Sequence, residues 1–299
     1  MNKPNFLIVG APKCGTTAMY QYLAAHPDVY MSALKEPHFF AEDIPGMRQV
    51  TTMDKYESLF PHSWQRYRRQ GEASVYYLFS NVALGRVREF NPSAQLIIML
   101  RNPVDMALSY HGGELFYGKE DVADFVTAWQ LQDQRKKGLA IPAGCRDPEL
   151  LQYRKVVALG SQVERALAIF PREQVHLVFF DDFVRDTRRE YEKLLEFLDV
   201  PSDGRTEFAK VNPRKVSRMR WWVNLNRRLV GKLPIGVIRL WRGLGLRKIT
   251  QALVEKKVEL SLPSEDFLRQ ISAELSPEID KLSDLAARDL DPWKRMEWL

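Results

Sequence analysis

The chain has 299 residues, of which 45% are apolar and 27% are charged, and its net charge is +6. It contains no run of 18 or more apolar residues, so no membrane-spanning helix is predicted. Its two cysteines, Cys14 and Cys145, form no CxxC pair and have no Cys/His spacing typical of zinc sites. We therefore expect one domain over residues 1–299, in a reducing compartment and without a structural metal.

The first predicted element is a strand–turn–helix unit at Phe6–Thr17, with the sequence FLIVGAPKCGTT. An apolar strand leads into a turn that holds two glycines and Lys13, and a helix begins at Thr16. The free N–H groups and the dipole at a helix N-terminus attract anions. The Lys13 ammonium and the hydroxyls of Thr16 and Thr17 add to this attraction, so a phosphate or sulfate ester is the expected ligand.

A second unit of this kind lies at Gln95–Gly118. The apolar run Gln95–Leu100 predicts a central parallel strand, which Arg101 ends. Pro103 is suited to an early helical position, and Ser109 falls about two turns into that helix. A guanidinium and a hydroxyl at this spacing are suited to a phosphate group.

Strand and helix signals alternate along the whole chain. The strands predicted at 6–9, 95–100 and 175–180 are each followed by a predicted helix, at 16–25, 104–116 and 186–198. This alternation predicts an α/β fold with a parallel sheet and helices on both of its faces. Ligands of such sheets bind beyond the carboxyl ends of the strands, where the Lys13 turn and Arg101 both fall. Residues 138–148 and 201–205 are predicted loops.

Positive charge is concentrated in residues 205–257, which hold 15 Lys or Arg against two Glu, a net charge of +13, whereas the rest of the chain carries −7. Three tryptophans and several apolar runs are interleaved with these cations. The pattern predicts a basic helical segment that contacts an anionic membrane or a lipid-linked substrate. An anionic polymer as ligand, or a solvated helical face with inward-packed tryptophans, remains open. No nucleic-acid-binding module is recognisable, so no nucleic-acid partner is expected.

The order of residues in PKCGTT separates the first turn from that of nucleoside triphosphatases, in which Lys directly follows the last Gly. It resembles the 5′-phosphosulfate loop of sulfotransferases that use 3′-phosphoadenosine 5′-phosphosulfate (PAPS), and Arg101 with Ser109 resembles the 3′-phosphate site of the same family. The resemblance implies a P-loop-like three-layer sandwich with a central parallel sheet. It also implies PAPS as sulfuryl donor, 3′-phosphoadenosine 5′-phosphate (PAP) as product and no metal. The implied phosphosulfate loop consists of Pro12, Lys13, Cys14, Gly15, Thr16 and Thr17.

The segment KEPHFF at 35–40 resembles the acidic segment of glycan O-sulfotransferases, including those that act on heparan sulfate. The resemblance implies that Glu36 takes the proton from the acceptor hydroxyl, with His38 as the next candidate. A neutral alcohol is a poor nucleophile, so the reaction needs such a base. The segment GEAS at 71–74 resembles a stretch that lines the cleft. Heparan-type enzymes often have a Lys where this chain has Ala73, which argues against heparan sulfate as the acceptor.

The resemblance extends to the end of the chain. Residues 175–183 match a late core strand, in which His176 is expected to be a core residue, and ARDLDPW at 287–293 matches the usual ending of the family. NPRKVSR at 212–218 resembles the loop that closes over PAPS, which implies donor contacts from Arg214, Lys215 and Arg218. Tyr76 and His111 are expected to contact the acceptor.

The expected function is transfer of a sulfuryl group from PAPS to a hydroxyl of a sugar, glycolipid or secondary metabolite, with Lys13 stabilising the leaving oxygen. The first core strand begins near residue 5, so a cytoplasmic enzyme is expected, membrane-peripheral through 205–257. Two alternatives remain open. One is a small-molecule kinase with Asp181 as a metal ligand, and the other is a non-enzymatic membrane-binding protein. Cys14 is expected to fill space in the loop, the alternative being a thiol whose pKa the helix N-terminus lowers.

Overall fold

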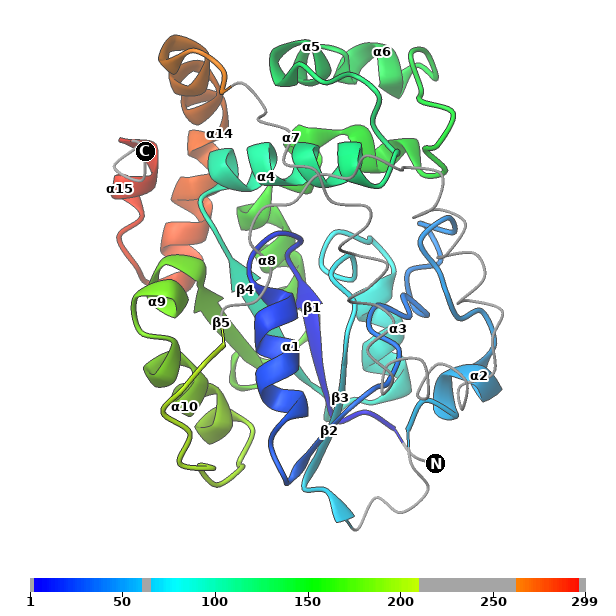
Figure 1. Ribbon diagram of the computed structural model, residues 1–299, viewed down its shortest axis with the longest axis vertical. Coiled ribbons are helices and arrows are strands. Elements are labelled where there is room, and N and C mark those ends of the chain that lie inside the picture. Colours follow the sequence, from blue (N-terminus) through cyan, green and yellow to red (C-terminus); the bar gives the residue numbers. More distant parts are fainter. Residues whose placement is uncertain (1–2, 61–65, 210–261, 296–299) are drawn as a thin grey trace.

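The computed structural model describes residues 3–60, 66–209 and 262–295. Within these residues, five parallel strands form one sheet in the order β2-β3-β1-β4-β5 (Figure 1). The strands are β1 (Phe6–Gly10), β2 (Val29–Met31), β3 (Arg69–Ala73), β4 (Gln95–Leu100) and β5 (Val175–Phe179). The expected α/β fold with a central parallel sheet is confirmed.

Helices connect and cover the strands. The described helices are α1 (Thr16–Ala24), α2 (Met53–Glu57), α3 (Ala83–Phe90), α4 (Pro103–Phe116), α5 (Phe125–Gln130), α6 (Gln132–Lys136), α7 (Tyr153–Val156), α8 (Leu159–Ile169), α9 (Phe180–Arg185), α10 (Thr187–Phe197), α14 (Glu265–Ala286) and α15 (Asp291–Lys294). Short 3-10 helices lie at Pro148–Leu151 and Arg172–Gln174. The three strands and three helices expected from the sequence are confirmed to within one or two residues at each end, but α9 lies between β5 and α10. None of these helices is both long and apolar enough to cross a membrane.

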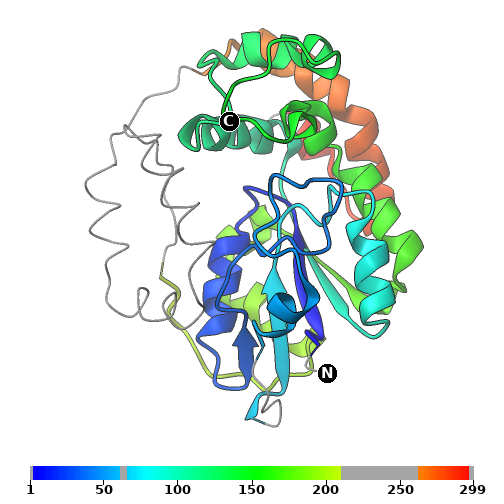
Figure 2. The same cartoon turned by 90° about the vertical axis from the view of Figure 1, so that its right-hand side faces the viewer.

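The sheet is the middle layer of three. Helix α1 lies on one side of it, and α3, α8 and α14 lie on the other (Figure 2). On the α1 side, the Tyr22 ring meets the rings of Phe183 and Tyr191, with centroids 6.1 and 6.5 Å apart, which joins α1 to α9 and α10. Because both faces are covered, strands β1 and β4 are apolar and buried nearly throughout, as parallel sheets require.

Three strands end side by side at the same edge of the sheet. The N–H of Ala11, just past β1, donates to Met99 O of β4 at 2.8 Å. From the segment after β3, Ser74 N–H donates to Ile8 O at 3.0 Å and Leu78 N–H donates to Val9 O at 2.9 Å. The turn after β1 therefore lies between the segments that follow β3 and β4.

The start of α4 and the end of the described chain are fixed together. The Asn102 side chain caps α4 by accepting from Val104 N–H at 2.9 Å, and Pro103 occupies the first turn as expected. The same side chain donates to Trp293 O at 3.0 Å, and the Trp293 indole donates to Asp181 Oδ2 at 2.7 Å. The segment at 287–293 is thereby attached beside the ends of β4 and β5.

Candidate functional site

The turn between β1 and α1 has the geometry of an anion site. Gly15 is the N-cap of α1 with φ 87°, and no side chain of the described residues caps the helix. The first N–H groups bonded within the helix are those of Ala18 and Met19, which donate to Gly15 O. The N–H groups of Thr16 and Thr17 therefore remain for a ligand. A Cβ at position 15 would lie 3.3 Å from the Phe180 ring, so glycine suits both the space and the φ angle.

Lys13 extends from this turn toward α4. Its own φ is 66°, in the left-handed region, and its side chain is exposed. A Cβ built at Gly113 of α4 would lie 3.3 Å from Lys13 Nζ. Because Gly113 has no side chain, it leaves room on α4 for the Lys13 ammonium.

Arg101 joins the end of β4 to the same turn. Its Nη1 donates to Lys13 O at 3.0 Å, its guanidinium lies 4.5 Å from the centroid of the Phe180 ring, and it forms an ion pair with Asp105. Ser109 follows one turn after Asp105 on α4 and is half-buried. The structure therefore places the two predicted phosphate-binding segments, after β1 and after β4, in direct contact.

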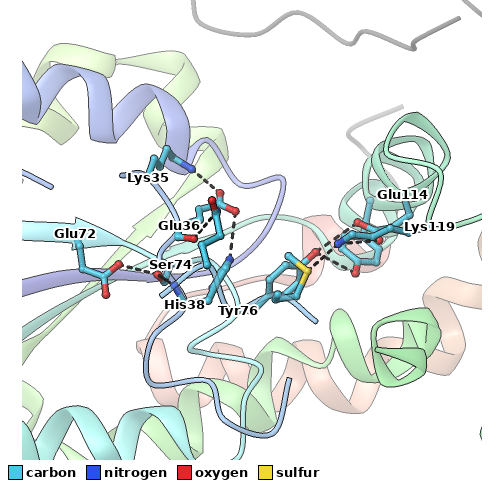
Figure 3. A network of polar contacts seen from close by, with 11 residues as sticks. Lys35, Glu36, His38, Glu72, Ser74, Tyr76, Glu114 and Lys119 are labelled. Atoms are coloured by element: carbon cyan, nitrogen blue, oxygen red, sulfur yellow. Dashed lines mark hydrogen bonds and ion pairs between the residues drawn. The ribbon is translucent and has the colours of Figure 1, made fainter. Parts of the chain in front are cut away.

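The candidate base lies in the loop after β2. Glu36 Oε1 is 2.6 Å from Lys35 Nζ, and its Oε2 is 3.4 Å from His38 Nε2 (Figure 3). The Glu36 side chain is 26% exposed, whereas that of His38 is fully buried. The carboxylate thus meets solvent on one side and is held by two nitrogen groups on the other.

Tertiary contacts hold this loop in a costly backbone conformation. Glu36 and His38 have φ values of 68° and 49°, and the left-handed region costs a non-glycine residue about 1–3 kcal/mol. Glu36 N–H donates to Ala73 O at 2.9 Å, and His38 N–H donates to Ser74 Oγ at 3.0 Å. Such strain concentrates at functional sites. The two hydrogen bonds place the loop at the carboxyl end of β3, beside the turn after β1.

The environment of Glu36 favours its ionised form. Burial alone would raise the pKa of this carboxyl, but the Lys35 charge and the hydrogen bond with His38 outweigh burial and hold the pKa well below its usual value. Glu36 is therefore a carboxylate near neutral pH, as a proton acceptor must be.

A second polar cluster continues from His38 to α4. The Tyr76 ring lies 5.3 Å from the His38 ring, and its hydroxyl oxygen lies 3.3 Å from Tyr110 Oη and 3.4 Å from Glu114 Oε1. Lys119 Nζ is 3.6 Å from Glu114 Oε2 (Figure 3). Tyr76 thus lies beside the candidate base, where the sequence expects an acceptor contact.

Other predicted residues lie in packed surroundings. His111 is 2% exposed, and its Nε2 is 2.9 Å from Val122 O. Burial lowers the pKa of this imidazole, and these contacts favour a packing role, although an acceptor contact stays a prediction. Burial raises the pKa of the Cys14 thiol to about 12, so the alternative of a low-pKa thiol is wrong. His176 is half-buried and stacks on Phe197 with centroids 5.0 Å apart, which agrees with a packing role.

The donor contacts predicted after residue 209 and the predicted metal chemistry have different outcomes. Arg214, Lys215 and Arg218, with most of the basic segment 205–257, lie outside the described residues. Among the residues described, no group of three or more His, Cys, Asp and Glu side chains is arranged to hold a metal ion. Asp181, the metal ligand of the kinase alternative, accepts instead from the Trp293 indole.

Two residues at the site, Gly113 and Glu72, are not indicated by any sequence pattern. Gly113 matters only because Lys13, a hundred residues earlier, reaches it. Glu72 lies buried beneath the Glu36 loop and accepts from the hydroxyls of Ser74 and Tyr56. Its segment matched a cleft-lining stretch of the family, which did not indicate a role for the carboxyl.

The fold and the site together define an α/β protein with an uncapped helix N-terminus after β1 and an ionised carboxylate in the loop held at the end of the neighbouring strand β3. The chain belongs to the sulfotransferase family, because residues 3–219 match the sulfotransferase domain. It is similar to the crystal structure of a sulfotransferase from Alicyclobacillus acidocaldarius, with 28% identity and a TM-score of 0.70 over 98% of this chain and 100% of that one.

Two human proteins are further relatives. Carbohydrate sulfotransferase 15 is 29% identical over 249 residues, which cover 66% of this chain and 44% of that protein. Heparan sulfate glucosamine 3-O-sulfotransferase 5 is 27% identical over 199 residues, which cover 66% of this chain and 54% of that protein. The chain thus spans about half the length of these relatives. The family assignment speaks against the kinase and the non-enzymatic alternatives.

Proposed function

We propose that the protein transfers a sulfuryl group from PAPS to a hydroxyl of a sugar, glycolipid or secondary metabolite and releases PAP. One observation carries the proposal. The Glu36–His38 pair is hydrogen-bonded to the end of β3, and the uncapped N-terminus of α1 follows the adjacent strand β1. A proton acceptor and an anion site are thus next to each other.

The residues present fit the donor. The uncapped N–H groups of α1 and the Lys13 ammonium suit the 5′-phosphosulfate, and Arg101 and Ser109 suit the 3′-phosphate. When bound, PAPS supplies the sulfuryl group and a phosphate as leaving group. Contacts from Arg214, Lys215 and Arg218 are part of the proposal through the family resemblance.

Each group of the site has a defined task. Glu36 takes the proton from the acceptor hydroxyl while the oxygen of that hydroxyl attacks the sulfur. His38 holds the Glu36 carboxylate in place through its contact with Oε2. Lys13 and the N–H groups of α1 stabilise the negative charge that develops on the departing phosphate oxygen. These cationic and dipolar groups neutralise the negative charge of the donor, a task that Mg²⁺ performs in phosphoryl transfer. We therefore expect that the reaction does not require a metal ion.

A sugar hydroxyl is the first acceptor to test. The two human relatives are named for carbohydrate and heparan sulfate substrates, and the Glu36 segment resembles that of glycan enzymes. Ala73 argues against heparan sulfate itself. A lipid-linked acceptor would agree with a membrane contact through 205–257, which remains a prediction, as does the cytoplasmic location.

Radiolabelled PAPS tests the proposal directly. The protein is incubated with the donor and, separately, with oligosaccharides, glycolipids and small alcohols, and transfer of label is measured beside release of PAP. We expect label in at least one acceptor without added Mg²⁺, and loss of that transfer in Glu36→Gln. Transfer that is undiminished in Glu36→Gln, or label that reaches no acceptor, would contradict the proposal.

A further inference from the structure

The mechanism above leaves unused a carboxyl group directly beneath the candidate base. Glu72 belongs to β3, and its side chain is fully buried. Its Oε2 accepts from the Ser74 hydroxyl at 2.7 Å, and its Oε1 accepts from the Tyr56 hydroxyl at 3.2 Å. A fully buried carboxylate is costly unless its hydrogen bonds are satisfied, so this arrangement points to a specific task.

Ser74 connects this carboxyl to the catalytic loop. Its hydroxyl donates to Glu72, and its oxygen accepts from His38 N–H at 3.0 Å (Figure 3). A hydroxyl has one proton to donate. While Glu72 accepts the hydrogen bond from Ser74, the lone pairs of the Ser74 oxygen point toward the backbone N–H of His38. A protonated Glu72 has a proton of its own to donate, and when that proton is directed at Ser74 Oγ, the Ser74 hydroxyl must donate elsewhere.

The orientation of Ser74 matters because the His38 backbone is strained. With φ at 49°, His38 depends on its anchoring contacts, and its imidazole in turn contacts Glu36 at 3.4 Å. We propose that Glu72 is a positioning residue for the Glu36–His38 pair, because its carboxylate orients the Ser74 hydroxyl that anchors His38. The assignment of this pair as the base rests on the proposed function, whereas the coupling of Glu72 to His38 does not.

The protonation of Glu72 changes in the physiological range. Burial raises the pKa of its carboxyl to about 7, against the opposing hydrogen bonds from Ser74, Tyr77 and Tyr56, and the nearby charge of Glu36 raises it further. As pH rises through about 7, Glu72 loses its proton and the anchor forms.

Nuclear magnetic resonance tests the coupling without donor or acceptor. The full chain has five histidines, so selective isotope labelling makes the His38 backbone N–H observable. We expect its resonance to shift with a midpoint near pH 7 in the wild type, and we expect Glu72→Gln and Ser74→Ala to abolish this shift. Glu190→Gln, at a buried glutamate paired with Lys193 on α10, should leave the shift unchanged. A midpoint retained in Glu72→Gln would assign the titration to His38 itself and overturn the proposal.

Turnover gives the second measurement. With PAPS and an acceptor, Glu72→Gln should lower kcat by about 10- to 100-fold, a loss typical of a mispositioned catalytic group. It should leave KM for PAPS unchanged and remove the decline of kcat below pH 7. An unaltered pH profile and kcat in this variant would overturn the positioning role. A wild type that transfers no sulfuryl group would overturn the proposed function alone, because the resonance experiment still decides whether Glu72 controls His38.

Discussion

The imidazole Nε2 of His38 lies 3.4 Å from Oε2 of Glu36, and both residues have a left-handed backbone conformation. Neither residue is a glycine, so this arrangement of the two side chains is accompanied by backbone strain. The contacts that offset this cost come from Ala73 and Ser74 at the end of β3. The candidate base belongs to a loop, but hydrogen bonds to the end of β3 hold that loop against the sheet.

Replacement of Glu36 by Gln should separate catalysis from donor binding. The amide has nearly the same shape but accepts a proton poorly, so we expect kcat to fall by about 100- to 10,000-fold, the usual contribution of a general base. Affinity for PAP should remain within a few-fold of the wild type. Steady-state kinetics and calorimetry measure the two effects. If His38 is the base instead, His38→Gln will cause the larger loss of kcat.

Gly113→Ala should disturb Lys13 without harming the fold. The three atoms nearest to the new Cβ would all belong to the Lys13 side chain, with Nζ at 3.3 Å, so the ammonium must give way by a few tenths of an ångström. We expect kcat to fall by about tenfold, as for a displaced catalytic group. Gly85→Ala on α3 is a matched control, because its Cβ meets nothing within 4 Å. Both variants should gain stability, since alanine favours a helix by about 1 kcal/mol over glycine. Equal activity in the two variants would contradict the placement of Lys13.

His176 should make stability fall in mild acid. Burial, reinforced by the charges of Lys193 and Arg172, lowers the pKa of this imidazole from 6.5 to about 4. The unfolded chain therefore binds the proton below about pH 6.5, whereas the folded protein binds it only near pH 4. Stability is thus lost as pH falls through this window, by about 3 kcal/mol at most.

His176→Phe tests this assignment, because it keeps a ring against Phe197. Denaturant unfolding of the variant and the wild type is compared at about pH 7 and about pH 4. The variant should gain relative stability at the lower pH. A stability difference that does not change with pH would show that His176 does not titrate in this way.

The buried ion pair between Glu120 and Arg135 should be essential for stability. The guanidinium contacts the carboxylate at 2.6 and 2.8 Å, and the Tyr153 hydroxyl donates to it at 2.5 Å. Glu120→Gln leaves a buried charge without its counterion, which costs about 3–5 kcal/mol. The double variant Glu120→Leu with Arg135→Met should be less destabilised, because it removes both charges. If the free energy of unfolding of the double variant is lower than that of Glu120→Gln, this account is contradicted.

The sequence predicts the parts of the fold that follow local rules. β4 lies where the continuous apolar run predicts a buried strand. α4 begins at Pro103, as its residues indicate. The turn after β1 was also predictable, because its glycines and Lys13 form a local pattern. Cys14 is fully buried, as expected of a residue that fills space in the loop, and His176 stacks on Phe197 in a half-buried position.

Long-range contacts account for what the sequence does not reveal. β3 is a strand that pairs with both β1 and β2, although its residues RQGEA carry no strand pattern. The positive φ values of Glu36 and His38 depend on partners more than 30 residues away. The link from Glu72 to His38 through Ser74 exists only once the loop has docked on β3, so no local pattern could indicate it.

The central claim is that the turn after β1 and Arg101 together bind the donor. Calorimetric titration with PAP in the absence of Mg²⁺, beside ATP with Mg²⁺, tests it most directly. We predict micromolar binding of PAP, weakened about 10- to 100-fold by Arg101→Ala, since hydrogen bonds to charged groups contribute about 1.5–3 kcal/mol. Absence of PAP binding together with Mg²⁺-dependent binding of ATP would contradict the account.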